Sequence, residues 1–145
     1  MYMEVIAAKL LQFMEALPRK APQNWLSDFN KGELFLLNYL HTNEDTACPT
    51  DMSEAMQTST ARIAAALNNL ERKGFITRES ATDGDLRRKL VHLTPEGNEY
   101  VKEYRSKALR NITKLLSELG EQDATEYLRI TQRIEAISRE LNFDL

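Results

Sequence analysis

The spacing of apolar residues in the middle of the chain changes from helical to alternating, and this change constrains the fold more than any other feature. Residues 50–56 and 59–73 have helical spacing, with Ile63, Leu67 and Leu70 on one face of the second segment. The stretches "FITRE" and "KLVHLT" then alternate apolar and polar residues around a turn-rich segment that contains Asp-Gly. The sequence therefore predicts a short helix, a tight turn, a longer helix and a β-hairpin, in that order.

Residues that favour helix ends support these boundaries. Thr50 is the expected N-cap of the first helix and Ser59 that of the second, while Gly74 is expected just past the end of the second helix. Thr94 followed by Pro95 predicts the start of a long helix, because proline fits the first helical position.

Apolar residues at steps of three and four predict long helices on both sides of this central unit. The first segment, which ends before Pro18, is predicted to be a helix with one buried face. The predicted fold class is mainly α with a small β-hairpin wing, that is, a winged helix-turn-helix flanked by long helices. The apolar positions that carry the prediction for the first helix are Met3, Ile6, Leu10, Phe13, Met14 and Leu17.

The charge is unevenly distributed along the chain. The formal net charge of −3 is weak evidence against general nucleic-acid binding. Residues 58–92, however, hold seven basic and four acidic side chains, a charge of +3, whereas the rest of the chain carries −6. A basic segment within an acidic chain predicts a local nucleic-acid-binding surface.

The second helix of the predicted pair has small side chains where a surface helix usually has long ones. Ser59, Thr60 and Arg62 are able to reach base edges or phosphates, and Ala61 and Ala65 are able to pack against thymine methyl groups. Such a narrow helix fits the major groove. The alternative is that the alanines support close helix packing and that Ser59 is only a cap.

The segment between the two predicted strands is basic. Arg87, Arg88 and Lys89 follow a glycine-containing turn, and Asp85 precedes Arg87 by two residues. An arginine on a narrow wing is able to enter the minor groove, and a nearby carboxylate orients its guanidinium. The alternative for this segment alone is a solvated charged loop, but its place after a helix-turn-helix favours DNA contact. The candidate DNA-contacting residues are Ser59, Thr60, Ala61, Arg62, Ala65, Asn68, Asp85, Arg87, Arg88 and Lys89.

These motifs resemble those of the multiple-antibiotic-resistance regulator (MarR) family of bacterial winged-helix repressors. "LERKG" closes the second helix, and "TPEG" opens the next long helix. The order of helices before and after them also fits, so the resemblance covers essentially the whole chain. The wing carries the pattern D-x-R-x-x-x-V-x-L-T in Asp85, Arg87, Val91, Leu93 and Thr94.

The resemblance implies a homodimeric repressor on a pseudo-palindromic operator, released by a small aromatic or phenolic ligand. A cytoplasmic location is expected because the single cysteine, Cys48, cannot form an intrachain disulfide. The resemblance also implies a single domain with dimerisation helices in residues 1–29 and 97–145 and a DNA-binding lobe in residues 30–96. Arg87 would be the minor-groove arginine and Asp85 its orienting partner. The chain departs from the family at Ala65, where members often have arginine, and at Asn68-Asn69, where they often have Asp-Arg. This departure concerns which bases are contacted.

Aromatic residues provide candidates for a ligand pocket and for a dimer core. Trp25, Phe29 and Tyr39 are candidates for lining an effector pocket, with core packing as the alternative. Tyrosines at helical spacing in the C-terminal half are interpreted first as part of a dimer core. They are Tyr100, Tyr104 and Tyr127.

Other functional classes find little support in the sequence. No catalytic triad, phosphate-binding glycine loop or metal-ligand spacing is present, so no enzyme, cofactor or metal is expected. No apolar run is long enough to span a bilayer, so no membrane partner is expected. Cys48 is interpreted as an inert thiol rather than a redox switch, and His41 and His92 as a helix-end and a strand-surface residue. Two alternatives remain: a winged-helix protein-interaction module and a redox-sensing regulator that uses Cys48.

Overall fold

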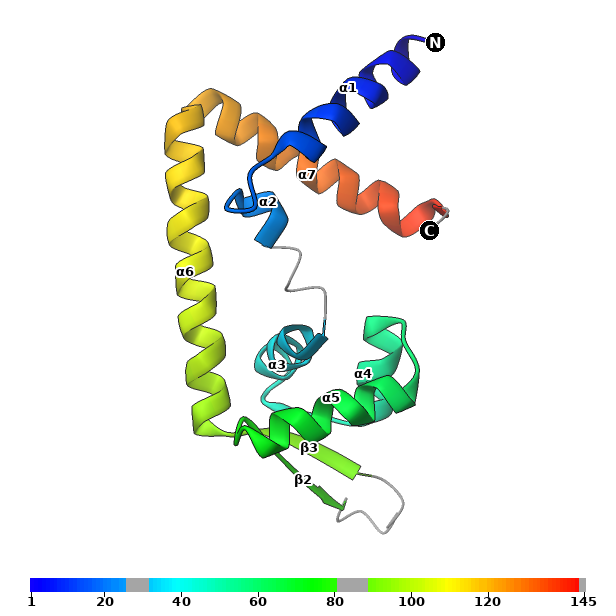
Figure 1. Cartoon of the computed structure of the whole chain (residues 1–145), viewed down its shortest axis with the longest axis vertical. Coiled ribbons are helices and arrows are strands. Elements are labelled where there is room, and N and C mark those ends of the chain that lie inside the picture. Colours follow the sequence, from blue (N-terminus) through cyan, green and yellow to red (C-terminus); the bar gives the residue numbers. More distant parts are fainter. Residues whose placement is uncertain (26–31, 81–88, 144–145) are drawn as a thin grey trace. The chain divides into compact units, whose positions relative to one another are not determined.

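The expected order of helices and hairpin is confirmed in the computed structural model (Figure 1). The structure describes residues 1–25, 32–80 and 89–143, without the side chain of Trp25. It forms two units, Met1–Ser106 and Lys107–Leu145, which are described separately below. The elements are α1 (Tyr2–Ala16), α2 (Pro22–Trp25), α3 (Gly32–Thr42), β1 (Thr46–Ala47), α4 (Pro49–Met56), α5 (Thr60–Arg72), β2 (Ile76–Ser80), β3 (Lys89–Leu93), α6 (Pro95–Leu119) and α7 (Glu121–Glu140).

The three strands form an antiparallel sheet in the order β1-β3-β2. Ile76 pairs with Leu93 at one end of the hairpin, and Ser80 pairs with Lys89 at the other. Apolar residues of α3, α4, α5 and the sheet form one core with the first turns of α6, because each element presents one apolar face to the others. The most buried members are Leu36, Leu37, Leu40, Met52, Ile63, Leu67, Leu70, Ile76, Val91 and Val101.

The caps at two helix starts agree with the sequence, and a third prediction is wrong. The amide of Arg62 donates to Ser59 Oγ at 3.2 Å, which confirms Ser59 as the N-cap of α5. The amide of Gly97 donates to Thr94 Oγ1 at 3.0 Å at the start of α6. Thr50 is not the N-cap of α4, because the helix begins at Pro49 with Cys48 as its N-cap. Proline needs no N–H partner and has a helical φ, so it starts the helix earlier than a capping threonine would.

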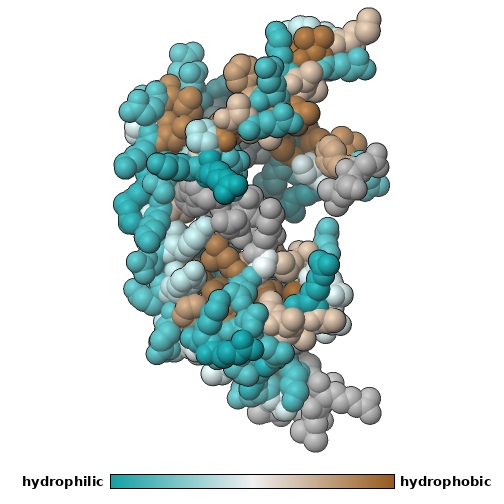
Figure 2. All heavy atoms as spheres, in the orientation of Figure 1, coloured by the Kyte–Doolittle hydropathy of each residue, from teal (hydrophilic) through white to brown (hydrophobic). Residues whose placement is uncertain are grey.

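The predicted buried face of the first helix is wrong for a single chain. α1 is helical as expected, but it has no buried residue, and Phe13 is 70% exposed. Hydrophobic atoms of α1 lie at the surface in Figure 2. In the other unit, α7 also has no buried residue, although Leu128, Ile134 and Ile137 are apolar. Each helix is amphipathic, as its periodicity predicts, but its large apolar side chains are mostly exposed and not buried within its own unit.

The start of α6 packs directly against the backbone that joins α5 to β2. Thr94 Oγ1 donates to the carbonyl of Gly74 at 2.7 Å, and the Thr94 amide donates to the carbonyl of Phe75 at 3.0 Å. A Cβ atom at Gly97 would lie 2.2 Å from the Phe75 carbonyl oxygen. The side chain of Tyr100, expected in a dimer core, stacks on Phe75 of its own chain with ring centroids 4.8 Å apart. Glycine at position 97 is therefore required by close backbone approach.

Substitution Gly97→Ala should lower the free energy of unfolding by about 1–3 kcal/mol, the usual cost of forcing extra volume into a packed site. Helix propensity alone predicts the opposite, a gain of about 1 kcal/mol. Chemical denaturation of the wild type and of Gly97→Ala distinguishes these two expectations. Substitution of the exposed Glu99 in the same helix, Glu99→Ala, is the control. An alanine variant as stable as the wild type would show that α6 does not approach Phe75 this closely.

Candidate nucleic-acid interface

Helix α5 has one buried face and, opposite it, an exposed face of small or polar residues. Ile63, Leu67 and Leu70 are each about 1% exposed in the core. Successive residues of an α-helix are rotated by about 100° about its axis, so residues that are four, three and four positions apart form a stripe along the opposite face. Every member is exposed, and because the first two are alanines, the N-terminal half of the stripe projects little beyond the helix backbone. The residues of this stripe are Ala61, Ala65, Asn68 and Arg72.

The turn before α5 presents the start of the helix to solvent. Gln57 has a left-handed backbone with φ of +55°, which reverses the chain between α4 and α5. Ser59, Thr60, Ala61 and Arg62 are all exposed. The N-terminal N–H groups of a helix and its dipole favour a phosphate at such a position. Ser59 Oγ accepts from the Arg62 amide, and its hydroxyl hydrogen remains able to donate.

Lys89 brings the hairpin next to this helix start. It is the first residue of β3, and Lys89 Nζ lies 3.4 Å from Ser80 Oγ across the hairpin. The side chain lines a shallow groove together with the starts of α4 and α5. The other residues of the groove are Cys48, Pro49, Thr50, Thr60, Ala61 and Ala64. A cationic side chain thus borders the exposed N-terminal part of α5.

The remaining predicted wing residues and two predicted pocket residues cannot be placed. Asp85, Arg87 and Arg88 lie outside the described residues, as does Phe29, and the side chain of Trp25 is not described. Tyr39 stacks on Phe35 with ring centroids 6.2 Å apart and packs partly buried against the core. Its position agrees with the core-packing alternative and leaves an effector pocket as a prediction.

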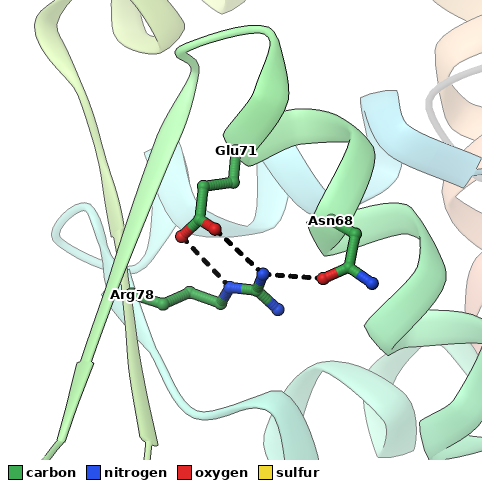
Figure 3. A network of polar contacts seen from close by, with 3 residues as sticks. All are labelled: Asn68, Glu71 and Arg78. Carbon is green, nitrogen blue, oxygen red and sulfur yellow. Dashed lines mark hydrogen bonds and ion pairs between the residues drawn. The ribbon is translucent and has the colours of Figure 1, made fainter.

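A polar network joins α5 to strand β2 (Figure 3). Arg78 donates from Nε and Nη2 to the two carboxylate oxygens of Glu71, at 3.2 and 3.0 Å. Arg78 Nη2 also donates to Asn68 Oδ1 at 2.7 Å. The hydrogen bonds from Arg78 lower the pKa of the Glu71 carboxyl, and Glu71 in turn raises the pKa of Arg78. Both groups are therefore charged at neutral pH.

The sequence interpretation counted Arg72 and Arg78 in the basic segment but named neither as a site residue. Arg72 could have been found from helical spacing, because it follows Asn68 by four residues on the exposed stripe. Arg78 could not be linked to Asn68 by local spacing, because the contact depends on how β2 packs beside α5.

Both histidines make hydrogen bonds that join neighbouring elements. His92 joins three strands, since its Nδ1 lies 2.9 Å from Thr46 Oγ1 and its Nε2 lies 2.7 Å from Glu79 Oε1. His41 Nδ1 lies 2.9 Å from Asn98 Oδ1, which joins α3 to α6. Within the described ranges, no group of three or more His, Cys, Asp or Glu residues is placed to hold a metal ion. The described helices also include none long and apolar enough to cross a membrane.

Comparison with known families identifies this architecture. Residues 33–113 match the model of the winged helix DNA-binding domain. The chain belongs to the winged helix DNA-binding domain family. This match begins in α3 and extends into α6, so it includes the helix-turn-helix, the hairpin and the helix that packs against Phe75. No curated protein sequence gives a significant match.

Solved structures with the same fold include transcription regulators. MepR, a transcription regulator of the Staphylococcus aureus multidrug efflux pump MepA, is 23% identical with a TM-score of 0.69, over 90% of this chain and 98% of its own. The S. aureus MepR–DNA complex is 25% identical with a TM-score of 0.64, over 93% of this chain and 97% of that chain. FabT of Streptococcus pneumoniae in complex with DNA is 16% identical with a TM-score of 0.68, over 98% of this chain and 100% of its own. The resemblance to MarR-type regulators is thereby confirmed for the fold, and the family match shows that the chain carries a winged helix DNA-binding domain.

Substitution of Ser59 should separate stability from DNA binding. Ser59→Ala removes the cap and should lower the free energy of unfolding by about 1 kcal/mol. Ser59→Asp keeps a capping oxygen and should leave stability within about 0.5 kcal/mol of the wild type, but should weaken DNA binding because a carboxylate then faces the phosphates. Thermal unfolding and fluorescence-anisotropy titration measure the two effects. Equal DNA affinity of the aspartate variant and the wild type would exclude Ser59 from the interface.

Proposed function

We propose that this winged-helix protein is a repressor that binds a pseudo-palindromic operator as a homodimer. In each half-site, α5 enters the major groove and the wing between β2 and β3 contacts the minor groove. The observation that supports this proposal best is the narrow exposed face of α5, which begins at a capped helix N-terminus beside Lys89. The small side chains of Ala61 and Ala65 would let the helix backbone approach the base edges closely.

The wing residues extend this surface in the proposal. Ser80 and Lys89 are paired in the sheet, and the segment that joins them contains Asp85, Arg87 and Arg88. We assign Arg87 to the minor groove, with Asp85 orienting its guanidinium, and Arg88 and Lys89 to phosphates. Because the rest of the chain is acidic, attraction to DNA would be confined to this surface.

Dimerisation would use the helices outside the lobe, in residues 1–29 and 97–145. The apolar faces of α1 and α7 are exposed in the single chain, and exposed apolar surface of this kind is usual where a partner binds. A second copy of the chain is the partner that we propose. Two lobes about 34–36 Å apart would meet successive major grooves, and the second contact would gain from a high effective concentration.

The proposed effector is a small aromatic molecule that binds near Trp25, Phe29 and Tyr39 and lowers DNA affinity. It would shift the protein toward an arrangement of the two lobes that fits the operator poorly. The shift is limited by the difference between the affinities of the ligand for the two arrangements.

DNA binding across a salt series tests the interface. Wild-type protein should bind selected fragments from a pool of genomic DNA, including the region upstream of its own coding sequence, and should bind more tightly as salt falls. Arg62→Ala and Arg87→Ala should each weaken binding, and loss of one phosphate contact should reduce the slope of log K against log salt by about one.

The matched control for these variants is Arg139→Ala, which removes an exposed arginine from the polar side of α7. It should bind DNA as the wild type does. Absence of sequence-selective binding by wild-type protein would contradict the proposed function and would favour a protein-docking module instead.

Substitution of an apolar residue in α1 should disrupt the proposed dimer. Leu10→Glu places a charge on the exposed apolar face, and the variant should have the mass of one chain where the wild type has that of two. Gln12→Glu adds the same charge to the opposite side of α1 and should remain dimeric. Sedimentation velocity measures both masses. A monomeric wild type, or a dimeric Leu10→Glu variant, would show that α1 does not form the interface.

A further inference from the structure

The contact between Arg78 and Asn68 determines which atoms Asn68 is able to offer to DNA. Guanidinium groups have only hydrogen-bond donors, so the side-chain atom of Asn68 that faces Arg78 must be the amide oxygen. Arg78 Nη2 donates to Asn68 Oδ1 at 2.7 Å, a short distance that is typical of charge-assisted hydrogen bonds. The amide NH₂ group of Asn68 is therefore directed away from Arg78. Asn68 itself is exposed on the stripe opposite the core.

Glu71 holds the guanidinium in place. Arg78 uses Nε and one hydrogen of Nη2 for the two oxygens of Glu71, and the other hydrogen of Nη2 faces Asn68 (Figure 3). The Arg78 side chain is 27% exposed, so it is partly shielded from water. Because the fork geometry of arginine is rigid, the two hydrogen bonds to Glu71 fix the direction of the third.

We propose that Arg78 is a positioning residue that turns the Asn68 amide oxygen toward itself, directs the NH₂ group toward DNA and thereby selects guanine. This inference rests on the proposed entry of α5 into the major groove. An asparagine usually recognises adenine with both groups of its amide, since Oδ1 accepts from N6 and Nδ2 donates to N7. With Oδ1 bound to Arg78, that pairing is disfavoured. The two hydrogens of the Asn68 NH₂ group match the two acceptors of guanine, N7 and O6.

The proposal separates two roles that an arginine near DNA could have. A direct phosphate contact by Arg78 would add affinity for every sequence and would contribute to the salt dependence. A positioning role changes the base preference at one position of each half-site and leaves the salt dependence unchanged. Base preference is thus the measurement that distinguishes the two.

The experiment is selection of bound duplexes from a randomised DNA library, followed by titration of single-base variants of the selected sequence. The position contacted by Asn68 is the one at which Asn68→Ala loses its preference. The wild type should prefer guanine there by about five- to tenfold over adenine. Arg78→Lys keeps the positive charge but not the rigid fork, and it should reduce this preference to less than about twofold with the salt slope unchanged. Asn68→Asp offers only acceptors and should shift the preference toward cytosine.

Matched controls show whether a loss is specific. Arg139 is also paired with a carboxylate, because its Nε and Nη2 both donate to Glu135 Oε1 within α7, and Arg139→Ala should keep the full base preference. Thermal unfolding tests whether each variant is folded. Arg78→Lys is the variant used because Arg78→Ala would remove both hydrogen bonds to Glu71 and could unfold the hairpin.

The possible outcomes distinguish this inference from the proposed function. A wild type without selective binding would overturn the proposed function. Selective wild-type binding with no preference lost in Asn68→Ala would overturn only the role of Asn68. Adenine at the Asn68 position, or an Arg78→Lys variant that weakens binding equally at all bases, would overturn the positioning role of Arg78.

Discussion

The packing of one face of α5 into the core is the constraint on which the rest of the lobe depends. Ile63, Leu67 and Leu70 are almost fully buried against α3, α4 and the sheet, so the opposite face must point outward. Burial of three such side chains contributes on the order of several kcal/mol, enough to fix the rotation of the helix about its axis. The outward residues are therefore free to be chosen for contact with DNA rather than for stability. The small residues Ala61 and Ala65 lie on this outward face.

Much of the fold follows from local patterns in the sequence. The switch in apolar period predicted the helix pair and the hairpin, and Ser59 and Thr94 predicted two helix starts because capping is a local interaction. The start of α4 was placed wrongly because a proline and a capping threonine compete over adjacent positions. The buried face predicted for α1 was wrong because periodicity reports an apolar face and not what covers it.

The interface was less predictable than the fold. Arg62 is exposed and Lys89 borders the groove at the start of α5, but only tertiary packing brings Lys89 there, and the DNA surface itself stays a prediction. The network of Asn68, Glu71 and Arg78 joins a helix to a strand, and such a contact has no signature in residue spacing. Sequence motifs therefore predict which segments would contact DNA, whereas the chemistry that each side chain offers depends on its neighbours in three dimensions.

The junction between α6 and the root of the hairpin has a mechanical consequence. At Gly97 the backbone of α6 packs against the Phe75 carbonyl without a side chain between them. Thr94 is also hydrogen-bonded to the segment that joins α5 to β2. Side chains absorb small displacements by changing rotamer, but two backbones in contact cannot. A tilt of the first turn of α6 must therefore be carried into the segment between α5 and β2. The junction would therefore transmit a tilt of α6 to the hairpin as a rotation.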